Sequence, residues 1–173
     1  MAAVNQIDID APPDAVFDVL ADPRTYARWV VGSRAVRAAD REWPAPGSVF
    51  DHAQGVGPLL LMDSTCVLES ERPSLLRMRV QARPISIAHV TLSLEPSEGG
   101  THVVMREGPA DLFSRLTMNP LTEPFMRLRN HESLKRLKRL AEGEEPRPEG
   151  DLPPRGHPAE GWVEASSRPA TGR

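Results

Sequence analysis

Residues 9–23 read IDAPPDAVFDVLADP, and this stretch decides how the N-terminal part of the chain folds. Its two adjacent prolines fix φ near the helical value and therefore suit the first turn of a helix. Asp22 and Pro23 then give a second helix start, with an N-cap residue followed by proline at the first helical position. The stretch predicts two short helices in succession, of which the second ends near Trp29. The apolar face of the first helix consists of Val16, Val19 and Leu20.

The residues around these two helices show the pattern of β-strands. Residues 4–10, before the helices, alternate between apolar and polar side chains with a period of two. Such alternation indicates an antiparallel sheet with one buried and one solvated face, and the glycine-containing turns indicate a meander. Six further strands are predicted after the helices, over residues 33–39, 48–54, 59–69, 75–81, 86–94 and 101–107.

A long helix is predicted at the end of the patterned region, from about Pro120 to Ala141, and Gly143 terminates it. Seven strands spaced by ~4.8 Å form a sheet about 34 Å wide. A helix is only ~10 Å across and cannot cover that width. We therefore expect an α+β fold in which a curved antiparallel sheet of about seven strands wraps around the C-terminal helix. The two short helices after the first strand close one end, and an apolar cavity is expected inside.

The composition of the chain excludes several classes of protein. The 173 residues carry a formal net charge of −3, so there is no basic excess with which to neutralise nucleic-acid phosphates. One cysteine excludes a disulfide within the chain. No apolar run approaches the ~20 residues of a membrane helix. The acidic N-terminal residues do not resemble a signal peptide, so we expect a cytoplasmic protein with no integral membrane segment.

The last part of the chain, residues 144–173, differs in composition from the rest. It contains six prolines and four glycines, and few aliphatic side chains. Such a segment buries too little apolar surface to offset its ordering entropy. We therefore expect a ligand-binding domain over residues 1–143 and a disordered tail over 144–173. The alternative is a short partner-binding motif around Trp162.

The stretch quoted above, together with Tyr26 and Trp29, resembles the START-related polyketide cyclase/dehydrase superfamily, also called SRPBCC. The resemblance extends over about residues 3–142. It implies the helix-grip fold of the birch pollen allergen: one strand, two short helices, six strands and a long C-terminal helix. Members include carriers of hydrophobic ligands, quinone-binding proteins and polyketide aromatase/cyclases. Since the matching residues are structural, the resemblance implies the fold without choosing among these functions.

Candidate site residues are those that strand alternation places inside the curved sheet, such as Glu107, or that lie on the apolar stripe of the C-terminal helix, which Asn130 interrupts. His52 and Glu107 are candidate catalytic residues, because an imidazole or carboxylate in an apolar cavity can move protons. The alternatives are a packed core histidine and a carboxylate paired with an arginine. Methionine suits a surface that must adapt to its ligand, although it is also ordinary core filler. The predicted cavity is lined by Trp29, Phe50, His52, Gln54, Met62, Cys66, Met78, Met105, Met126 and Asn130.

No motif in the sequence indicates a metal or a cofactor, since there is no Cys/His ligand spacing, no Walker loop and no Gly-x-Ser-x-Gly elbow. We interpret the protein as a binder or carrier of a hydrophobic small molecule, either lipid-like or polycyclic. The alternatives are a polyketide cyclase/dehydratase and a protein-interaction module. If His52, Glu107 and Asn130 lie within hydrogen-bond reach of one another, the enzyme is favoured. If they diverge, the carrier is favoured.

Overall fold

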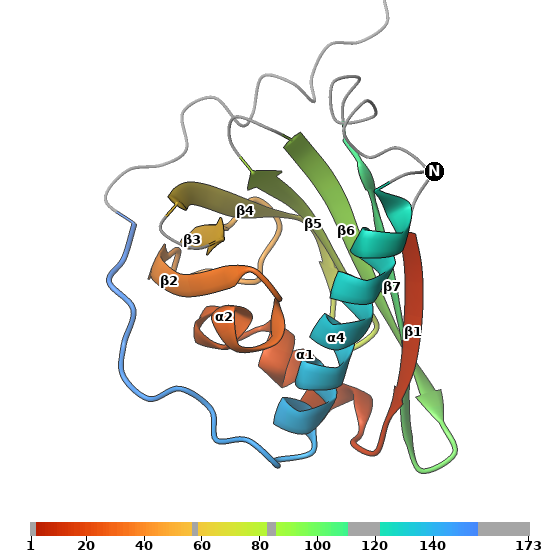
Figure 1. Ribbon diagram of the computed structural model, residues 1–173. Coiled ribbons are helices and arrows are strands. Elements are labelled where there is room, and N and C mark those ends of the chain that lie inside the picture. The colour runs from red at the N-terminus through yellow and green to blue at the C-terminus, as the bar shows by residue number, and fades with distance from the viewer. Residues whose placement is uncertain (1–2, 57–58, 83–85, 111–121, 156–173) are drawn as a thin grey trace, which may run out of the picture.

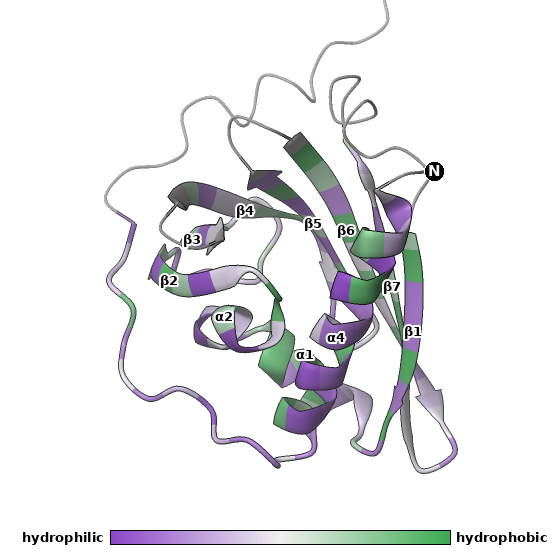
Figure 2. Cartoon of the chain, viewed as in Figure 1, coloured by the Kyte–Doolittle hydropathy of each residue, from purple (hydrophilic) through white to green (hydrophobic). Residues whose placement is uncertain are grey.

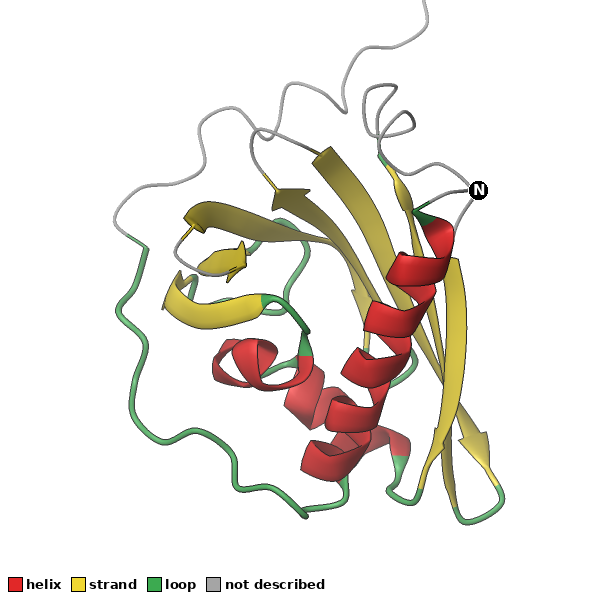
Figure 3. Ribbon diagram, viewed as in Figure 1, coloured by secondary structure: helices red, strands yellow, loops and turns green. Residues whose placement is uncertain are grey.

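The computed structural model describes residues 3–56, 59–82, 86–110 and 122–155, and it shows one curved sheet that partly encloses a long helix (Figure 1). Short helices follow the first strand, and the long helix comes last (Figure 3). The elements in chain order are β1 (Ala3–Ile9), α1 (Pro13–Leu20), the 3-10 helix η1 (Pro23–Thr25), α2 (Tyr26–Trp29), β2 (Ser33–Ala39), β3 (Val49–Val56), β4 (Leu59–Glu71), β5 (Leu75–Ala82), β6 (Ser86–Ser97), β7 (Gly100–Pro109) and α4 (Glu123–Ala141).

The seven strands form a single antiparallel sheet in the order β1-β7-β6-β5-β4-β3-β2. Strands β2 to β7 follow one another as a meander, and β1 pairs with the last of them. The sheet does not close, because β1 and β2 are its two edges. This confirms the α+β fold and the predicted antiparallel meander of about seven strands.

Helix α4 lies on the concave side of the sheet, where it packs against β1, α1 and α2 (Figure 1). In Figure 2, β1 and α4 carry hydrophobic and hydrophilic residues in turn along their length, as expected for elements with one buried face. The helix-grip arrangement is therefore confirmed. The predicted first residues of the helix, 120 and 121, lie outside the described residues. The buried face of α4 consists of Asn130, Ser133, Leu134, Leu137 and Leu140.

The start signals quoted from the sequence operate as predicted. Pro13 is the first residue of α1, and the Asp22 carboxylate caps η1 by accepting a hydrogen bond from the Arg24 backbone N–H at 3.0 Å. In the turn between β6 and β7, Gly99 has φ of +87°, and a Cβ on Gly100 would collide with the backbone of Ile9. Glycine is therefore required in the turn that leads into β7.

The structure also describes residues 144–155, which lie beyond the predicted domain boundary at residue 143. They run along the outside of α2 and β2 (Figure 1), and Leu152 packs against the hydrophobic core. Pro154 forms an isolated bridge with Ala39 at the end of β2. Composition alone does not anticipate these contacts. The rest of the segment, including Trp162, lies outside the described residues.

Candidate functional site

Polar side chains from α2, β3, β4, β7 and α4 meet on the concave side of the sheet. The alternation of side chains along β3, β4 and β7 turns the strand residues of this group inward, among apolar neighbours such as Phe50 and Met105. All but the arginine are buried, and the Arg129 side chain is 23% exposed. We call this group the inner polar cluster, and its members are Tyr26, His52, Thr65, Glu107, Arg129 and Asn130.

A buried ion pair forms one half of the inner polar cluster. Glu107 Oε2 accepts hydrogen bonds from Arg129 Nη2 at 2.6 Å and from Asn130 Nδ2 at 2.8 Å. The Asn130 carbonyl oxygen in turn accepts from Arg129 Nη2 at 3.1 Å. The carboxylate is thus held by two donors from adjacent residues of α4, and its charge is compensated inside the fold.

Ser133 fixes the turn of α4 that carries this pair. Its hydroxyl donates to the Arg129 carbonyl at 2.9 Å and accepts from the Val31 backbone N–H at 3.1 Å. The second bond joins α4 to the segment between α2 and β2. Ser133 therefore links the backbone of Arg129 to Val31.

His52 and Thr65 form the other half of the cluster, with His52 Nε2 3.1 Å from Thr65 Oγ1. The imidazole packs against the rings of Tyr26 and Phe50, with centroids 5.0 and 5.4 Å away. Its Nδ1 is buried and has no hydrogen-bond partner among the described residues. Burial lowers the pKa of His52 from 6.5 to about 4, so the ring is neutral near pH 7.

Tyr26 interacts with both halves of the cluster, through a hydrogen bond with the Thr65 side chain and through the charges of Arg129 and Glu107. Burial raises the pKa of Tyr26 to about 12, while the Thr65 side chain and the positive charge of Arg129 oppose the shift. The phenol therefore stays protonated and remains available as a hydrogen-bond donor. The cluster as a whole combines neutral donors with one compensated ion pair.

The three residues chosen from the sequence as polar candidates are brought together only in part. Glu107 and Asn130 are hydrogen-bonded, as stated above. His52 has no exposed surface and bonds to Thr65 instead of to either of them. Glu107 is paired with an arginine, which was the alternative to a proton-transfer role. The catalytic roles of His52 and Glu107 remain predictions.

The predicted lining residues differ in how far they are buried. Trp29, Phe50, Met78 and Met105 belong to the hydrophobic core and have almost no exposed surface. Gln54 and Met126 are partly exposed. A ligand site lined by these residues would therefore adjoin Gln54 and Met126. It would not adjoin the four core residues.

The predicted inward orientation of Met62 is wrong, and the same is true of Cys66. Met62 is 55% exposed, whereas Asp63, Thr65 and Val67 are buried. The register explains this, because Thr65 lies directly opposite Phe50 and shares its face. Cys66 is buried on the other face, where Arg79, Asp40 and Arg155 influence its thiol. The prediction chose the more apolar face of β4, but the interior of this sheet contains polar groups.

Sequence reasoning missed Arg129, Thr65 and the role of Tyr26. Tyr26 was noted only as part of the resemblance, and the inward orientation predicted for Met62 and Cys66 left Thr65 on the outer face. Arg129 follows Met126 by three residues and precedes Ser133 by four, so it lies on the edge of the apolar stripe of α4. That spacing was a usable signal. Nothing in the sequence connects it with Glu107 on β7.

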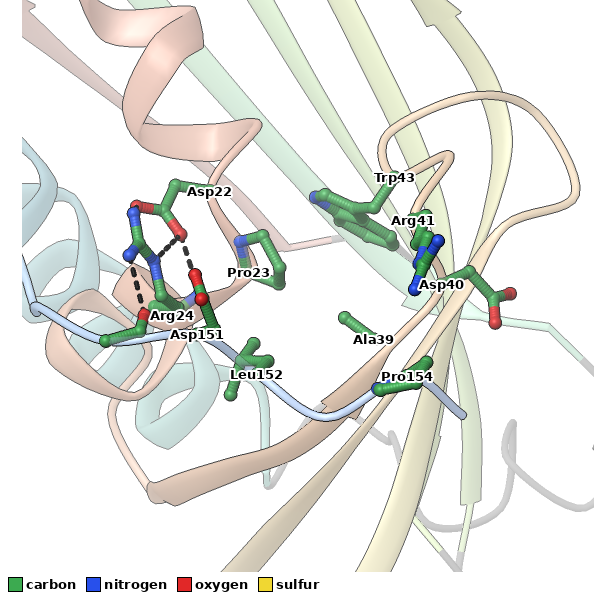
Figure 4. A pocket seen from close by; sticks show the side chains of 11 residues that line it. Asp22, Pro23, Arg24, Ala39, Asp40, Arg41, Trp43, Asp151, Leu152 and Pro154 are labelled. Atoms are coloured by element: carbon green, nitrogen blue, oxygen red, sulfur yellow. Dashed lines mark hydrogen bonds and ion pairs between the residues drawn. The ribbon is translucent and has the colours of Figure 1, made fainter. Parts of the chain in front are cut away.

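A pocket of about 450 Å³ lies outside the concave side, between η1, the end of β2 and residues 150–154. Figure 4 shows Trp43 and Arg24 on opposite walls of this pocket. A second pocket, of about 290 Å³, lies beside the same segment and is lined by Arg28 and Arg34 among others. Residues 150–152 thus border both pockets.

The described ranges contain no group of three or more His, Cys, Asp or Glu side chains that could hold a metal ion. Within the same ranges, every helix is too short or too polar to cross a membrane.

Comparison with known proteins agrees with this architecture. A family model described as "Polyketide cyclase / dehydrase and lipid transport" matches residues 2–142. The chain therefore belongs to that family. No curated protein matches the chain.

Solved structures of low sequence identity share the fold. Protein NE0264 from Nitrosomonas europaea is 20% identical, with a TM-score of 0.65, over 84% of this chain and 96% of that one. Protein CV1439 from Chromobacterium violaceum is 17% identical, with a TM-score of 0.66, over 82% and 97%. The di-domain ARO/CYC protein StfQ from the steffimycin biosynthetic pathway is 9% identical, with a TM-score of 0.66, over 83% and 51%. At these identities the likeness shows the fold alone.

Proposed function

We propose that this member of the polyketide cyclase/dehydrase and lipid transport family binds a hydrophobic small molecule that carries an uncharged oxygen at its buried end. The apolar part of the ligand lies between the first turns of α4 and the neighbouring strand ends. The oxygen lies against Arg129. Family membership supports a hydrophobic ligand, and the inner polar cluster supports the oxygen.

The proposed position follows from the gradient of burial along the concave side. Leu134, Leu137 and Leu140 of α4 are buried in the core at one end. Met126 near the start of α4, Gln54 near the end of β3 and Val80 near the end of β5 are all partly exposed. In Figure 1 the start of α4 and the end of β5 lie toward the top of the view, and β3 lies to the left. Arg129 lies between the two regions along α4, beneath the proposed apolar site.

The single observation that carries the proposal is the hydrogen bonding of Arg129. Its Nη2 is occupied by Glu107 and Asn130, and its Nε contacts Asn130 at 3.3 Å. Among the described residues, nothing accepts from Nη1. A guanidinium has five N–H donors in a fixed plane, so Nη1 is held in place with two donors to offer. Because Glu107 already compensates the charge, a neutral carbonyl or hydroxyl fits better than a carboxylate.

The same geometry supports a binder over a cyclase. Glu107 Oε2 already accepts from both Arg129 and Asn130, which makes the carboxylate the anchor of the cluster. His52 is enclosed by the rings of Tyr26 and Phe50 and presents no surface to a ligand.

A matched pair of probes, 2-naphthol and 2-methylnaphthalene, tests this function with the full chain. They are similar in size and differ in the oxygen. We expect 2-naphthol to bind about tenfold more tightly, the ratio that corresponds to ~1.4 kcal/mol for one hydrogen bond to a charged donor. Arg129→Met should abolish that preference and leave the affinity for 2-methylnaphthalene unchanged. Probe fluorescence in a titration measures both affinities.

Arg127→Met is the matched control, since Arg127 is exposed on the same helix and, among the described residues, its ion pair is with Glu123. Because Arg129→Met leaves Glu107 unpaired, the double variant Glu107→Gln/Arg129→Met provides a charge-neutral second test. If neither probe binds the wild-type chain, hydrophobic binding itself is refuted. If both bind equally, the role of Arg129 is refuted.

A further inference from the structure

We propose that the outer edge of β2, together with Asp40 and Asp51, is a docking surface for an extended peptide with the pattern Leu-Pro-Pro-Arg. In this structure the surface holds that pattern from its own chain, at residues 152–155. The same pattern supplied by another chain would bind in its place. We call residues 150–155 the strap.

The strap meets β2 as a short additional strand. The Ala39 backbone N–H donates to the Pro153 carbonyl at 3.3 Å, and Ala39 and Pro154 form a parallel bridge. β2 is an edge of the sheet, so its outer backbone groups are available to an added chain. Proline has no N–H, so Pro153 and Pro154 cannot donate to the edge, and the Pro153 carbonyl accepts the bond from Ala39. The contact is therefore confined to one position.

Arg155 supplies the charged anchor. Its Nε donates to Asp51 Oδ2 at 2.9 Å, and its Nη1 lies 3.8 Å from Asp40 Oδ2. The Arg155 side chain is only 11% exposed, whereas those of Asp51 and Asp40 are 31% and 29% exposed. The guanidinium is therefore enclosed by the domain, while the two acids stay accessible to water from one side.

The domain holds both acids in place independently of the strap. Asp51 Oδ1 accepts from the Ser64 hydroxyl at 2.8 Å, and Asp40 Oδ2 accepts from the Val49 backbone N–H at 2.8 Å. A site whose acids are already oriented loses little entropy when it binds a guanidinium. Asp40 and Asp51 lie within residues 2–142, which the family model matches, and the strap lies beyond them. The surface thus belongs to the domain, and its occupant belongs to the appended segment.

Two further contacts complete the fit. Arg24, which Asp22 orients, donates from Nη1 to the Gly150 carbonyl at 2.8 Å. Leu152 packs against the hydrophobic core. Pockets of about 450 and 290 Å³ remain beside the strap, so it touches the domain at a few anchors and does not fill the groove (Figure 4). A segment held at separate anchors can be replaced by a competing peptide.

The tether sets the strength of that competition. A covalently linked segment acts at an effective concentration on the order of millimolar. A free peptide therefore binds detectably once the strap of the chain has lost its anchors. The adjacent prolines favour an extended conformation before binding, which lowers the cost of docking.

The test uses a fluorescent peptide with the sequence of residues 148–155, PEGDLPPR, and the full chain carrying Leu152→Ala/Arg155→Ala. We expect the peptide to bind this variant at least tenfold more tightly than it binds the wild-type chain. Replacing the arginine of the peptide by alanine, or adding Asp51→Asn to the variant, should weaken binding at least tenfold. Anisotropy measures the affinities.

Hydrogen exchange of the Ala39 amide gives a second, residue-specific readout. Exchange should be faster in the Leu152→Ala/Arg155→Ala variant than in the wild type, and the peptide should restore protection. Arg147→Ala is the matched control, because Arg147 is an exposed arginine of the same segment that forms no ion pair among the described residues. Equal binding of the arginine and alanine peptides, or no binding to the variant, overturns the proposal.

Discussion

The molecule uses the same chemical pair in two contrasting places. Inside the sheet, Arg129 and Glu107 are 2.6 Å apart, and the side-chain exposure of the carboxylate is 6%. At the edge of β2, Arg155 and Asp51 are 2.9 Å apart, and the side-chain exposure of the carboxylate is 31%. From the N···O distance alone, the two ion pairs would be expected to contribute similarly to stability. The carboxylates differ in whether water can solvate them once the arginine is gone.

The surroundings of the two pairs also differ in how much charge they carry and in how far that charge is solvated. Near the inner pair, Tyr26 and His52 remain uncharged at neutral pH because burial shifts both pKa values away from ionisation. At the outer pair, one arginine lies beside two acids, and the excess charge faces solvent. A buried pair therefore depends on both partners, whereas an edge pair tolerates the loss of one. This difference can be tested by substitution.

The largest effect is expected from Glu107→Leu, which removes the buried carboxylate that compensates the partly buried Arg129 charge. Removing one partner of a buried pair costs about 3–5 kcal/mol in free energy of unfolding. Urea denaturation of the full chain measures it. Glu123→Leu is the matched control, because Glu123 pairs with the exposed Arg127 on the surface of α4, and we expect it to cost under about 1 kcal/mol. Equal losses for the two variants would mean that burial does not distinguish the pairs.

A smaller effect is expected when the pH charges His52. The pKa of His52 is about 4 in the folded chain and 6.5 in an exposed histidine, so between these values the unfolded chain binds more protons. Stability from this group is complete above pH 6.5 and decreases as the pH falls toward 4. Between pH 7 and pH 4.5 we expect a loss of about 2–3 kcal/mol.

The His52→Gln variant isolates this contribution from the other groups that titrate in the same range. Between pH 7 and pH 4.5, the free energy of unfolding of this variant should fall by about 2–3 kcal/mol less than that of the wild type. Denaturation midpoints at half-unit pH steps provide the comparison. Parallel curves for the wild type and the variant would contradict a neutral, buried imidazole.

The smallest effect on stability is expected from Arg155→Ala, since its partners remain solvated. The loss should be under about 1 kcal/mol at low salt and should shrink further in 1 M NaCl, where the Debye length is ~3 Å. The cost of Glu107→Leu should change little with salt. Denaturation at two ionic strengths checks both expectations. A salt-independent cost at Arg155 would place that pair in the same class as the inner one.

Much of the fold could be predicted from the sequence because it depends on local patterns. The prolines and Asp22 start helices through their own backbone chemistry, and alternation identifies strands one at a time. The prediction failed at Met62 and Cys66, where the rule that the more apolar face turns inward conflicts with a polar interior. Register with β3 decided the orientation, and pairing between strands is a tertiary property.

The candidate site was less predictable than the fold for a related reason. Asn130 was recognised because it interrupts an apolar stripe, and Glu107 because it continues an inward face. Arg129 was missed because its partner lies 22 residues away on another element. The strap contacts were missed because composition describes how a segment behaves alone. It does not reveal that Asp40 and Asp51 of the domain are placed to bind Arg155.

The two open edges of the sheet have a consequence for how the protein is made. At one edge, β1, the Asn5 side chain donates to the Arg127 carbonyl of α4, and Lys138 of α4 donates to the Asp8 carbonyl. At the other edge, β2, the strap forms a bridge with Ala39. Both covering elements are translated after all seven strands. Until α4 and the strap have been synthesised, any sheet that the strands form has uncovered edges, and an uncovered strand edge promotes aggregation.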